Sequence, residues 1–357
     1  MNESSDLMAS ETQAYSYPLP IAVSTFVVTC FGILGNLLII CAIWRSKEMH
    51  TRCHVLIGLL AITDMVVCFY YSTLRIFIFM NMYNMTNSEC FMRGIYGLFA
   101  MNAQAGLTLA LALDRLFAIV KPASYRNWQA KSYLSFICAP ATLYAIPMTM
   151  YGYFSSSRDL SVLVCMPPTA YAGKSRSVWT YSQVFISACV LLLYTWAQLS
   201  FWRMKKSSGF DGTMLIANKV FQSLAVVMAV YSATWALTFL MMLITLFLRS
   251  PTVQKTIELW LVWPVIINSS SNVIIYWWRS KEFRKAFVRI LFANDVEILK
   301  RSTVWSKGSR RRTIAGSIKP LTVLPYICRH MKTGTGNIRN EYRANDFDVR
   351  AHSTNTQ

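Results

Sequence analysis

Long stretches of this chain contain no Asp, Glu, Lys or Arg, and short polar segments separate them. The six charge-free stretches span residues 18–44, 94–113, 132–157, 177–202, 220–248 and 259–278. A seventh apolar stretch, at about 55–80, is interrupted only by Asp64 and Arg75. Each is as long as the ~20 apolar residues that carry a helix across a bilayer, and none alternates like a barrel strand. The pattern therefore predicts an all-α membrane protein, a bundle of seven transmembrane helices.

Composition agrees with this fold class and divides the chain into segments. The 357 residues are 54% hydrophobic and 14% charged, whereas soluble domains carry roughly 25% charged residues. Residues 1–18 are polar and contain no Lys or Arg, so they lack the order of a cleaved signal peptide. We expect an extracellular N-terminal segment at 1–18 and a transmembrane domain at 19–279, whose first helix acts as an uncleaved insertion signal.

The net charge of +19 is concentrated near the C-terminus, because 17 of the 35 Lys and Arg lie at or after Arg279. A basic segment beside a membrane fits contact with anionic lipid headgroups. Membrane lipids are therefore a predicted partner, and nucleic acid is not. Residues 300–357 are polar, basic and rich in Ser and Thr. We expect a disordered basic cytoplasmic tail over 294–357.

The loop charges give an orientation. With the N-terminus outside, the inner loops carry ten Lys and Arg and the outer segments six, leaving aside the tail and Arg115. This agrees with the positive-inside rule. Two glycosylation sequons, at Asn2 and Asn84, would then face the side on which glycans are added. The predicted protein is multi-pass, with its N-terminus extracellular, in the plasma membrane.

Nine cysteines give a second indication of the same topology. Five fall within predicted spans, where a thiol packs as a small apolar group. Cys53 and Cys328 would face the reducing cytosol. Cys90 and Cys165 alone fall in predicted outer segments, where disulfides persist. We therefore expect a Cys90–Cys165 disulfide between the start of the third helix and the second outer loop.

Asp64 lies in the middle of the second span, where an ionisable group is costly and marks a functional hypothesis. It is either an acid satisfied by its neighbours or a hub that binds a cation or changes protonation between states. Buried polar groups associate with one another, so the mid-span polar residues of the first and seventh spans are its expected partners. The predicted hub consists of Asn36, Asp64, Asn268 and Ser269.

Arg75 follows Asp64 by 11 residues, or about 16 Å of helix toward the outside. It could extend to the lipid headgroups, or it could face an outer cavity and bind an anionic ligand. Glu258, at the outer start of the seventh span, is a possible partner in either case. The four histidines form no metal-ligand pattern in the sequence, and we find no phosphate-binding loop or nucleophile elbow.

Asp114 and Arg115 end the third span. Arg115 is 25 residues after Cys90, about 37 Å along a helix, which is slightly more than the hydrocarbon core of a bilayer. The pair therefore lies at the inner membrane face, opposite the expected disulfide. It is either an ordinary boundary marker or a functional ion pair.

Together these residues resemble the rhodopsin-like G-protein-coupled receptors over about residues 18–292. The features that carry the resemblance are GN in the first span, LAITD in the second, Cys90, the Asp114-Arg115 pair, YSATW ending at Trp235, and NVIIY at 272–276. Phe283, seven residues after Tyr276, is placed like the phenylalanine of a short amphipathic eighth helix, which we expect at 280–293. The divergent motifs are most similar to the nematode srsx-type chemoreceptors.

The resemblance implies a receptor that transmits binding of an extracellular ligand, an odorant-like small molecule or a peptide, to a heterotrimeric G protein. It implies that Asp114 holds Arg115 at rest and that Arg115 is released toward Tyr194 and Tyr276 on activation. The residues implied in coupling are Asp114, Arg115, Tyr194, Trp235, Asn272 and Tyr276. The residues expected in the ligand pocket are Arg75, Leu98, Met101, Asn102, Thr238, Phe239, Met242, Glu258 and Val262.

Several positions depart from the family pattern. The prolines usual in helices 5, 6 and 7 are replaced by Ile186, Leu237 and Val273. The family resemblance implies a sodium ion near Asp64, but Gln104 stands where a small hydroxyl is usual, which argues against this site. Apart from this ion, we predict no metal and no cofactor. Ile266 replaces the retinal-binding lysine of opsins, and Gly97 replaces the third-helix acid of amine receptors.

Two other functions fit less well. A transporter usually shows repeated halves and interrupted helices, and no internal repeat is visible here. A membrane enzyme needs paired acids, or a nucleophile with its base, inside the spans, and Asp64 stands alone among the spans as an acid at mid-membrane depth. We therefore predict a receptor and no enzyme.

Overall fold

The computed structural model describes residues 18–82, 85–162, 164–207, 226, 229–248 and 250–292. The predicted glycosylation sites Asn2 and Asn84 and the predicted tail at 294–357 lie outside these residues. The longer helices are α2 (Leu19–Arg45), α3 (Arg52–Phe79), α4 (Asn87–Val120), α6 (Ala130–Phe154), α8 (Gly173–Ser207), α10 (Leu237–Thr245), α11 (Pro251–Trp260), α12 (Val262–Arg279) and α13 (Lys281–Leu291). The short elements are η1 (Lys47–Met49), β1 (Met85–Thr86), α5 (Pro122–Asn127), β2 (Ser161–Val162), α7 (Pro167–Ala170) and η2 (Ser232–Ala236).

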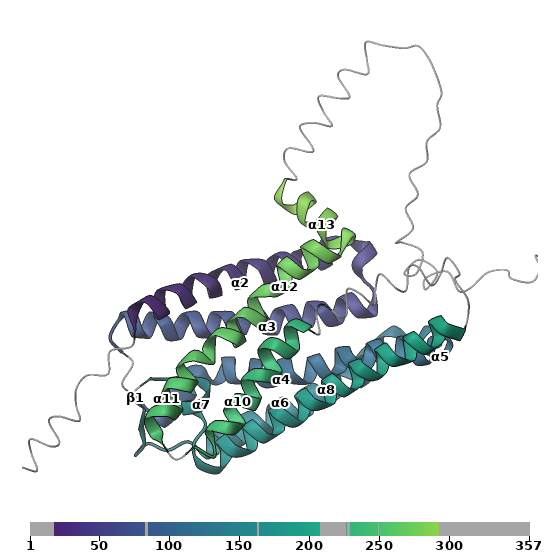
Figure 1. The fold of residues 1–357 in the computed structure, drawn as a ribbon. Coiled ribbons are helices and arrows are strands. Elements are labelled where there is room, and N and C mark those ends of the chain that lie inside the picture. The colour runs from purple at the N-terminus through teal and green to yellow at the C-terminus, as the bar shows by residue number, and fades with distance from the viewer. Residues whose placement is uncertain are drawn as a thin grey trace, which may run out of the picture. The chain divides into compact units, whose positions relative to one another are not determined.

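The described helices form the membrane bundle that the apolar pattern predicts (Figure 1). Within the described residues, six helices are long and apolar enough to cross a membrane, and α11 together with α12 supplies the sixth. A shorter apolar helix covers Ala229–Thr245, inside the stretch predicted at 220–248. The chain is thus a multi-pass membrane protein with a seven-helix bundle.

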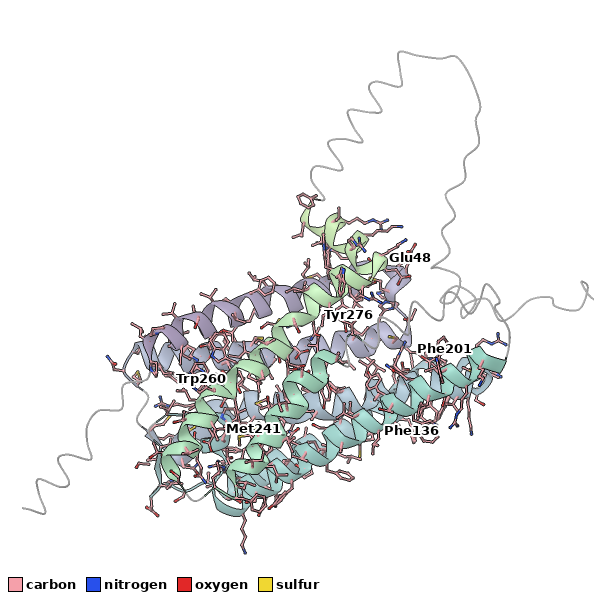
Figure 2. The ribbon with its side chains drawn as sticks, in the orientation of Figure 1. Glu48, Phe136, Phe201, Met241, Trp260 and Tyr276 are labelled. Atoms are coloured by element: carbon pink, nitrogen blue, oxygen red, sulfur yellow. A yellow bond between two sulfur atoms is a disulfide. The ribbon has the colours of Figure 1, made fainter. Side chains whose placement is uncertain are left out.

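Large apolar side chains cover the outside of the bundle as well as its inside (Figure 2). Phe136 on α6 and Trp260 at the end of α11 are 63% and 56% exposed. So large an exposed apolar surface would be unfavourable in water. The hydrocarbon of a bilayer, by contrast, solvates apolar side chains well. Lipid therefore takes the place that water has around a soluble bundle.

At one end of the bundle, which we call the disulfide end, Cys90 and Cys165 form the predicted bond. α4 begins there with a capping box: the Glu89 N–H donates to Thr86 Oγ1 and the Thr86 N–H donates to the Glu89 carboxylate. β1 and β2 pair antiparallel beside it. The Asn87 amide donates to the carbonyls of Thr169 and Ala170. Together these contacts fix the segment before α8 against the start of α4.

α4 packs closely against its neighbours because glycine faces them at two points. A Cβ on Gly97 would lie 2.2 Å from Tyr70 Cγ on α3, and a Cβ on Gly106 would lie 2.5 Å from Ala141 Cα on α6. Small residues allow transmembrane helices to approach closely, which increases van der Waals contact. α4 therefore occupies the interior of the bundle, and many of its side chains are buried on all sides.

The sixth helix has no proline at Leu237, where the family usually has one, and its helical hydrogen bonding changes there by another route. Residues Ser232–Ala236 form a π-helical turn, η2, directly before α10. π-turns insert an extra residue into a helix and occur often at functional sites. The turn contains Trp235, so the backbone irregularity lies at one of the residues that the family resemblance implies in coupling.

Replacing Cys165 with Ser should lower the melting temperature of the purified protein and reduce its delivery to the cell surface. Loss of a native disulfide typically lowers the free energy of unfolding by about 2–5 kcal/mol. Cys189→Ser is the matched control, because Cys189 is a free cysteine on α8. An unchanged melting temperature after reduction of the wild-type protein would contradict this expectation.

Candidate functional site

A cavity opens between the helices at the disulfide end. Its walls come from α3, α4, α8, α10, α11 and α12, with the segment at Met166–Pro168 as a further wall. Six predicted pocket residues line it: Met101, Thr238, Phe239, Met242, Glu258 and Val262. The cavity is small, about 20 Å³, which is roughly the space that a single water needs. A ligand larger than this must move the walls apart.

The segment directly after Cys165 also lines the cavity, which we did not predict from the sequence. Met166, Pro167 and Pro168 line the cavity directly after Cys165. Trp179 on α8 lines it too, and its ring is stacked on Tyr171 with centroids 4.9 Å apart. Adjacency to Cys165 was the one available signal. The disulfide thus holds part of the cavity wall as well as the fold.

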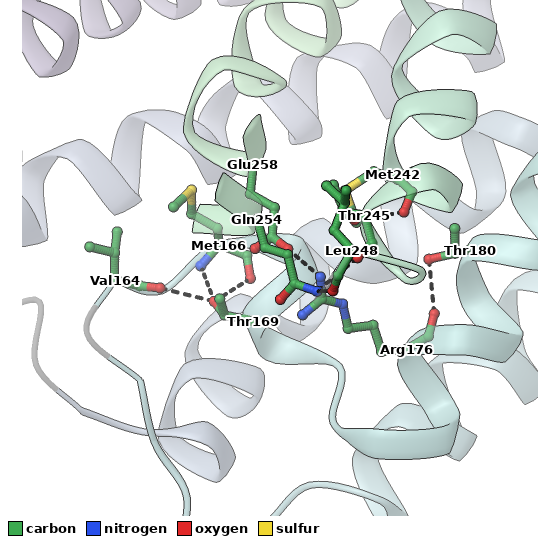
Figure 3. A network of polar contacts seen from close by, with 10 residues as sticks. All are labelled: Val164, Met166, Thr169, Arg176, Thr180, Met242, Thr245, Leu248, Gln254 and Glu258. Carbon is green, nitrogen blue, oxygen red and sulfur yellow. Dashed lines mark hydrogen bonds and ion pairs between the residues drawn. The ribbon is translucent and has the colours of Figure 1, made fainter. Parts of the chain in front are cut away.

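One ion pair borders the cavity (Figure 3). An Nη of Arg176 on α8 donates to Glu258 Oε1 on α11, and the Glu258 side chain is 6% exposed. Glu258 lines the cavity and Arg176 does not. Nearby, the Gln254 amide donates to the carbonyls of Thr245 and Leu248 at 2.8 and 2.7 Å. These contacts join α8, α10 and α11. The partner considered for Glu258 from the sequence was Arg75, and the structure gives it Arg176.

Three residues predicted to line the pocket do not line this cavity. Leu98 and Arg75 are buried elsewhere in the bundle, at 1% and 0% exposure. Arg75 therefore does not extend to the lipid headgroups as one interpretation proposed. The third residue is Asn102, whose side-chain amide makes hydrogen bonds to other residues of the protein.

The Asn102 side chain connects three parts of the chain behind the cavity wall. Its nitrogen donates to Thr149 on α6 and to the Tyr171 hydroxyl, each at 3.0 Å. Its oxygen accepts from Trp179 Nε1 at 3.0 Å and from Gln183 at 3.3 Å. All of its hydrogen-bonding capacity is satisfied. Asn102 positions α4, α6 and α8 and leaves no group for a ligand.

In the middle of the bundle, Asp64 is buried and both of its carboxylate oxygens accept amide hydrogens. Gln104 donates to Oδ1 at 2.5 Å, and Asn272 donates to Oδ2 at 2.7 Å. Gln104 also donates to Ser269 Oγ at 3.2 Å. Asn36 reaches the same region from α2 and donates to the Ser269 carbonyl at 2.8 Å. The structure therefore brings α2, α3, α4 and α12 together around Asp64.

Asn268, the fourth predicted hub residue, bonds to the sixth helix. Its Oδ1 accepts from Thr234 in η2 at 3.1 Å. Trp235, next to Thr234, is 1% exposed, and its ring lies 5.2 Å from that of Phe239, a cavity residue. A continuous set of contacts thus runs from the cavity through η2 to α12, one helical turn before Asn272.

At the end of the bundle opposite the disulfide, which we call the Asp114 end, Asp114 and Arg115 form the expected ion pair. Arg115 donates to Asp114 Oδ2 through Nε at 3.0 Å and through an Nη at 2.5 Å. The Asp114 side chain is fully buried, and that of Arg115 is 17% exposed. Two hydroxyls that the sequence did not indicate, those of Tyr125 and Tyr133, donate to Asp114 Oδ1 at 3.0 and 3.1 Å.

Tyr194 and Tyr276 make no hydrogen bond to Arg115 in this state. Tyr194 is buried on α8, and the Tyr276 ring is stacked on Phe283 of α13 at 4.8 Å. This stacking packs the start of α13 against the end of α12. Phe283 is the residue whose spacing of seven from Tyr276 indicated an eighth helix. α13 itself starts with Ser280 as its N-cap, which accepts from the Phe283 N–H.

The family model described as "Serpentine type 7TM GPCR chemoreceptor Srsx" matches residues 29–291. The chain belongs to this family.

Curated relatives of this Srsx receptor are also G-protein-coupled receptors. It is 24% identical to sphingosine 1-phosphate receptor 1 of Danio rerio, over 74% of this chain and 76% of the relative. It is 26% identical to melatonin receptor type 1B-B of Danio rerio, over 74% and 79% of the two chains. It is 25% identical to olfactory receptor 2L5 of Homo sapiens, over 73% and 86%. The predicted class, a ligand-binding G-protein-coupled receptor, is confirmed.

The hub of the Srsx receptor does not fit the sodium ion that the wider family implies. A hard cation needs several converging oxygen ligands, but N–H groups of Gln104 and Asn272 face both oxygens of Asp64. Two buried amide oxygens of hub residues, Asn36 Oδ1 and Gln104 Oε1, accept no hydrogen bond from the described residues, and two neutral amide oxygens without a free carboxylate oxygen do not make a coordination shell. Among the described residues, no group of three or more His, Cys, Asp and Glu lies together elsewhere.

The purified receptor should therefore melt at the same temperature in NaCl as in KCl of equal concentration. Gln104→Ser would remove the amide and supply a hydroxyl, so this variant should gain a sodium-specific rise in melting temperature. Gln183→Ser is the matched control, because Gln183 is a buried glutamine bonded to Asn102 and remote in sequence from the hub. A sodium-specific rise in the wild-type protein would show that the amides do not exclude the ion.

Proposed function

We propose that the receptor lies in the plasma membrane with the disulfide end outside and the Asp114 end facing the cytosol. Residues 1–18 are then extracellular, Asn2 and Asn84 can carry glycans, and the basic segment 294–357 lies beside the anionic inner leaflet. Positive charge in the inner loops and a disulfide in the outer segments support this orientation. α13 then lies at the inner membrane surface as the eighth helix.

The ligand in this proposal is a small extracellular molecule that enters the cavity at the disulfide end. The walls are mainly apolar and aromatic, with Thr238 and the paired Glu258 as polar groups, which is the usual composition of a small-molecule site. The relatives are named as receptors for sphingosine 1-phosphate and melatonin and as an olfactory receptor. An odorant-like molecule fits these walls better than a peptide, because the cavity of the resting structure is small.

The observation that carries the proposal is the position of the Asp114–Arg115 pair at the opposite end from the cavity, with contacts that run from the cavity as far as Asn268 on α12. A ligand that displaces Phe239 acts on Trp235 and the π-turn. Thr234 passes the movement to Asn268 on α12. The ligand performs no covalent chemistry in this scheme. It shifts an equilibrium in proportion to its difference in affinity for the two states.

In the state that activates the G protein, Arg115 leaves Asp114 and turns toward Tyr194, Tyr276 and the G protein. Such an exchange of partners in a buried ion pair is a common form of two-state switch. Tyr194 lies on α8, which packs against α4, and Tyr276 lies near the end of α12, against α13. Among the implied coupling residues, Asp114, Arg115 and Tyr276 thus lie at the end that a cytosolic partner would reach once the helices separate.

Replacing Arg115 with Ala should abolish G-protein activation while cell-surface expression persists. The test is heterologous expression with a G-protein readout, with and without a library of small ligands. Loss of surface expression in place of signalling would mean that Arg115 is a structural residue. Full signalling by the variant would contradict the proposed coupling site.

The cavity itself can be tested once the library yields an agonist. Met242→Trp fills the cavity from α10, so it should raise the agonist concentration for half-maximal response by roughly tenfold or more, equivalent to ~1.4 kcal/mol. Met241→Trp is the matched control, because Met241 is the neighbouring residue on the same helix and does not line the cavity. Equal effects of the two variants would place the ligand elsewhere.

A further inference from the structure

Glu258 is the one charged residue among the described residues that line the cavity. Its side chain is 6% exposed, and the other lining residues are mainly apolar and aromatic. A buried carboxylate that loses its partner is strongly unfavourable, because no water is at hand to compensate its charge. Glu258 therefore needs a donor at its carboxylate both before and after a ligand enters the cavity.

Arg176 supplies this donor in the resting structure, but its own side chain is less well satisfied. One Nη donates to Glu258 Oε1 (Figure 3), whereas the buried Nε makes no hydrogen bond with the described residues. The contact thus lacks the paired, fork-like geometry that makes arginine–carboxylate pairs strong. The Arg176 side chain is 24% exposed, so water can replace Glu258 as its partner.

The positions of the two residues connect this exchange of partners to ligand entry. Trp179 lines the cavity and follows Arg176 by three residues on α8, so the two lie on one face of that helix. Gln254, one turn before Glu258, anchors α11 to two carbonyls at and just after the end of α10. A ligand that pushes α8 outward at Trp179 therefore moves Arg176 away from Glu258.

We propose that the ligand is a protonated amine with an apolar body, and that its ammonium group takes the place of Arg176 at Glu258. The ammonium N–H groups restore a charge-assisted hydrogen bond to the carboxylate, while Arg176 gains water at its Nε. A neutral ligand would offer Glu258 only a weaker donor, and a carboxylate ligand would repel it. Alkylamines carry the positive charge at pH 7, as the lysine side chain does.

The carboxylate in this proposal comes from α11 and not from the third helix. Amine receptors carry their acid at the position of Gly97, where the Tyr70 ring fills the adjacent space. Glu258 offers an acid from another wall of the bundle. The rings of Trp179 and Phe239 in the same cavity also favour a cation, because the faces of aromatic rings are electron-rich.

The proposal names the ligand class of the cavity in the proposed function and rests on that site. The test uses the purified receptor and sets of molecules that share a carbon skeleton: hexylamine with hexanol and hexanoic acid, and benzylamine with benzyl alcohol and benzoic acid. A ligand that binds the folded protein raises its melting temperature as the concentration increases, which yields a dissociation constant. Each amine should bind roughly tenfold more tightly than its alcohol or acid.

Single substitutions in the ion pair should change amine binding in opposite directions. Glu258→Gln should weaken it by roughly tenfold or more and leave alcohol binding within about twofold of wild type. Arg176→Gln should strengthen it by about threefold, because glutamine competes less well for the carboxylate and still gives Glu258 a hydrogen bond. Asp159→Asn is the matched control: Asp159 is an exposed acid two residues before β2 and does not line the cavity.

The double variant Arg176→Gln/Glu258→Gln separates ligand recognition from a purely structural role of the pair. Two glutamines can keep a hydrogen bond between α8 and α11 without any charge, so the preference for amines over alcohols should disappear. A preference that survives in this variant would overturn the proposal. Equal losses for amines and alcohols in Glu258→Gln would also overturn it, as would a wild-type receptor that binds no amine or binds the alcohols or acids more tightly.

G-protein activation by the same molecules is measured separately in cells. An amine that raises the melting temperature and activates a G protein supports both the ligand class and the proposed function. An amine that binds with the expected pattern among the variants but activates no G protein contradicts the proposed function and leaves the ligand class standing. Activation by the alcohols or acids alone overturns the ligand class and leaves the proposed function standing.

Discussion

Inside a bilayer no water is present to replace a missing hydrogen bond, so every polar side chain there must find its partner within the protein. This constraint organises the receptor along its length. Near the cavity, Asn102 bonds to four groups from three segments. At mid-depth, Asp64 is satisfied by two amides. At the far end, Asp114 accepts from an arginine and two tyrosines. Each set of contacts also fixes the helices that contribute to it.

The same constraint makes these sites able to switch. A buried polar group that loses one partner must gain another, so the helices that carry the partners move between discrete arrangements. The hydrogen bond from Thr234 to Asn268 meets this description, since it joins the sixth helix to α12, and the ring contact of Trp235 with Phe239 connects it along the sixth helix to the cavity. The π-turn at Ser232–Ala236 gives the sixth helix a local irregularity where the family usually has a proline. The sixth helix thus has Leu237 where the proline is usual, and still has an irregular turn directly before this position.

The apolar pattern predicted the helices of the bundle, and the places of the cysteines relative to these spans predicted the disulfide, because both depend on position along the chain; the eighth helix was expected from the family resemblance. The apolar pattern was also sufficient to bring Asn36, Asp64 and Ser269 together, since few polar residues occur at that depth. Partners across the bundle were harder to predict. Arg176 and Glu258 are 82 residues apart, and nothing in the sequence distinguishes Tyr125 and Tyr133 among 18 tyrosines. Such pairings depend on how each helix is rotated about its axis, which composition does not determine.

The close approach at Gly97 limits which ligands related receptors on this backbone can come to recognise. Amine receptors place an acid at this point of the third helix, but here the ring of Tyr70 occupies the space that even a methyl group would need. Tyr70 is fully buried, so it cannot simply turn aside. A single substitution toward an acid would damage the packing of α3 on α4 before it created a binding site. An acid at residue 97 therefore needs a smaller side chain at residue 70 as well, so amine recognition at this point requires a change of both residues.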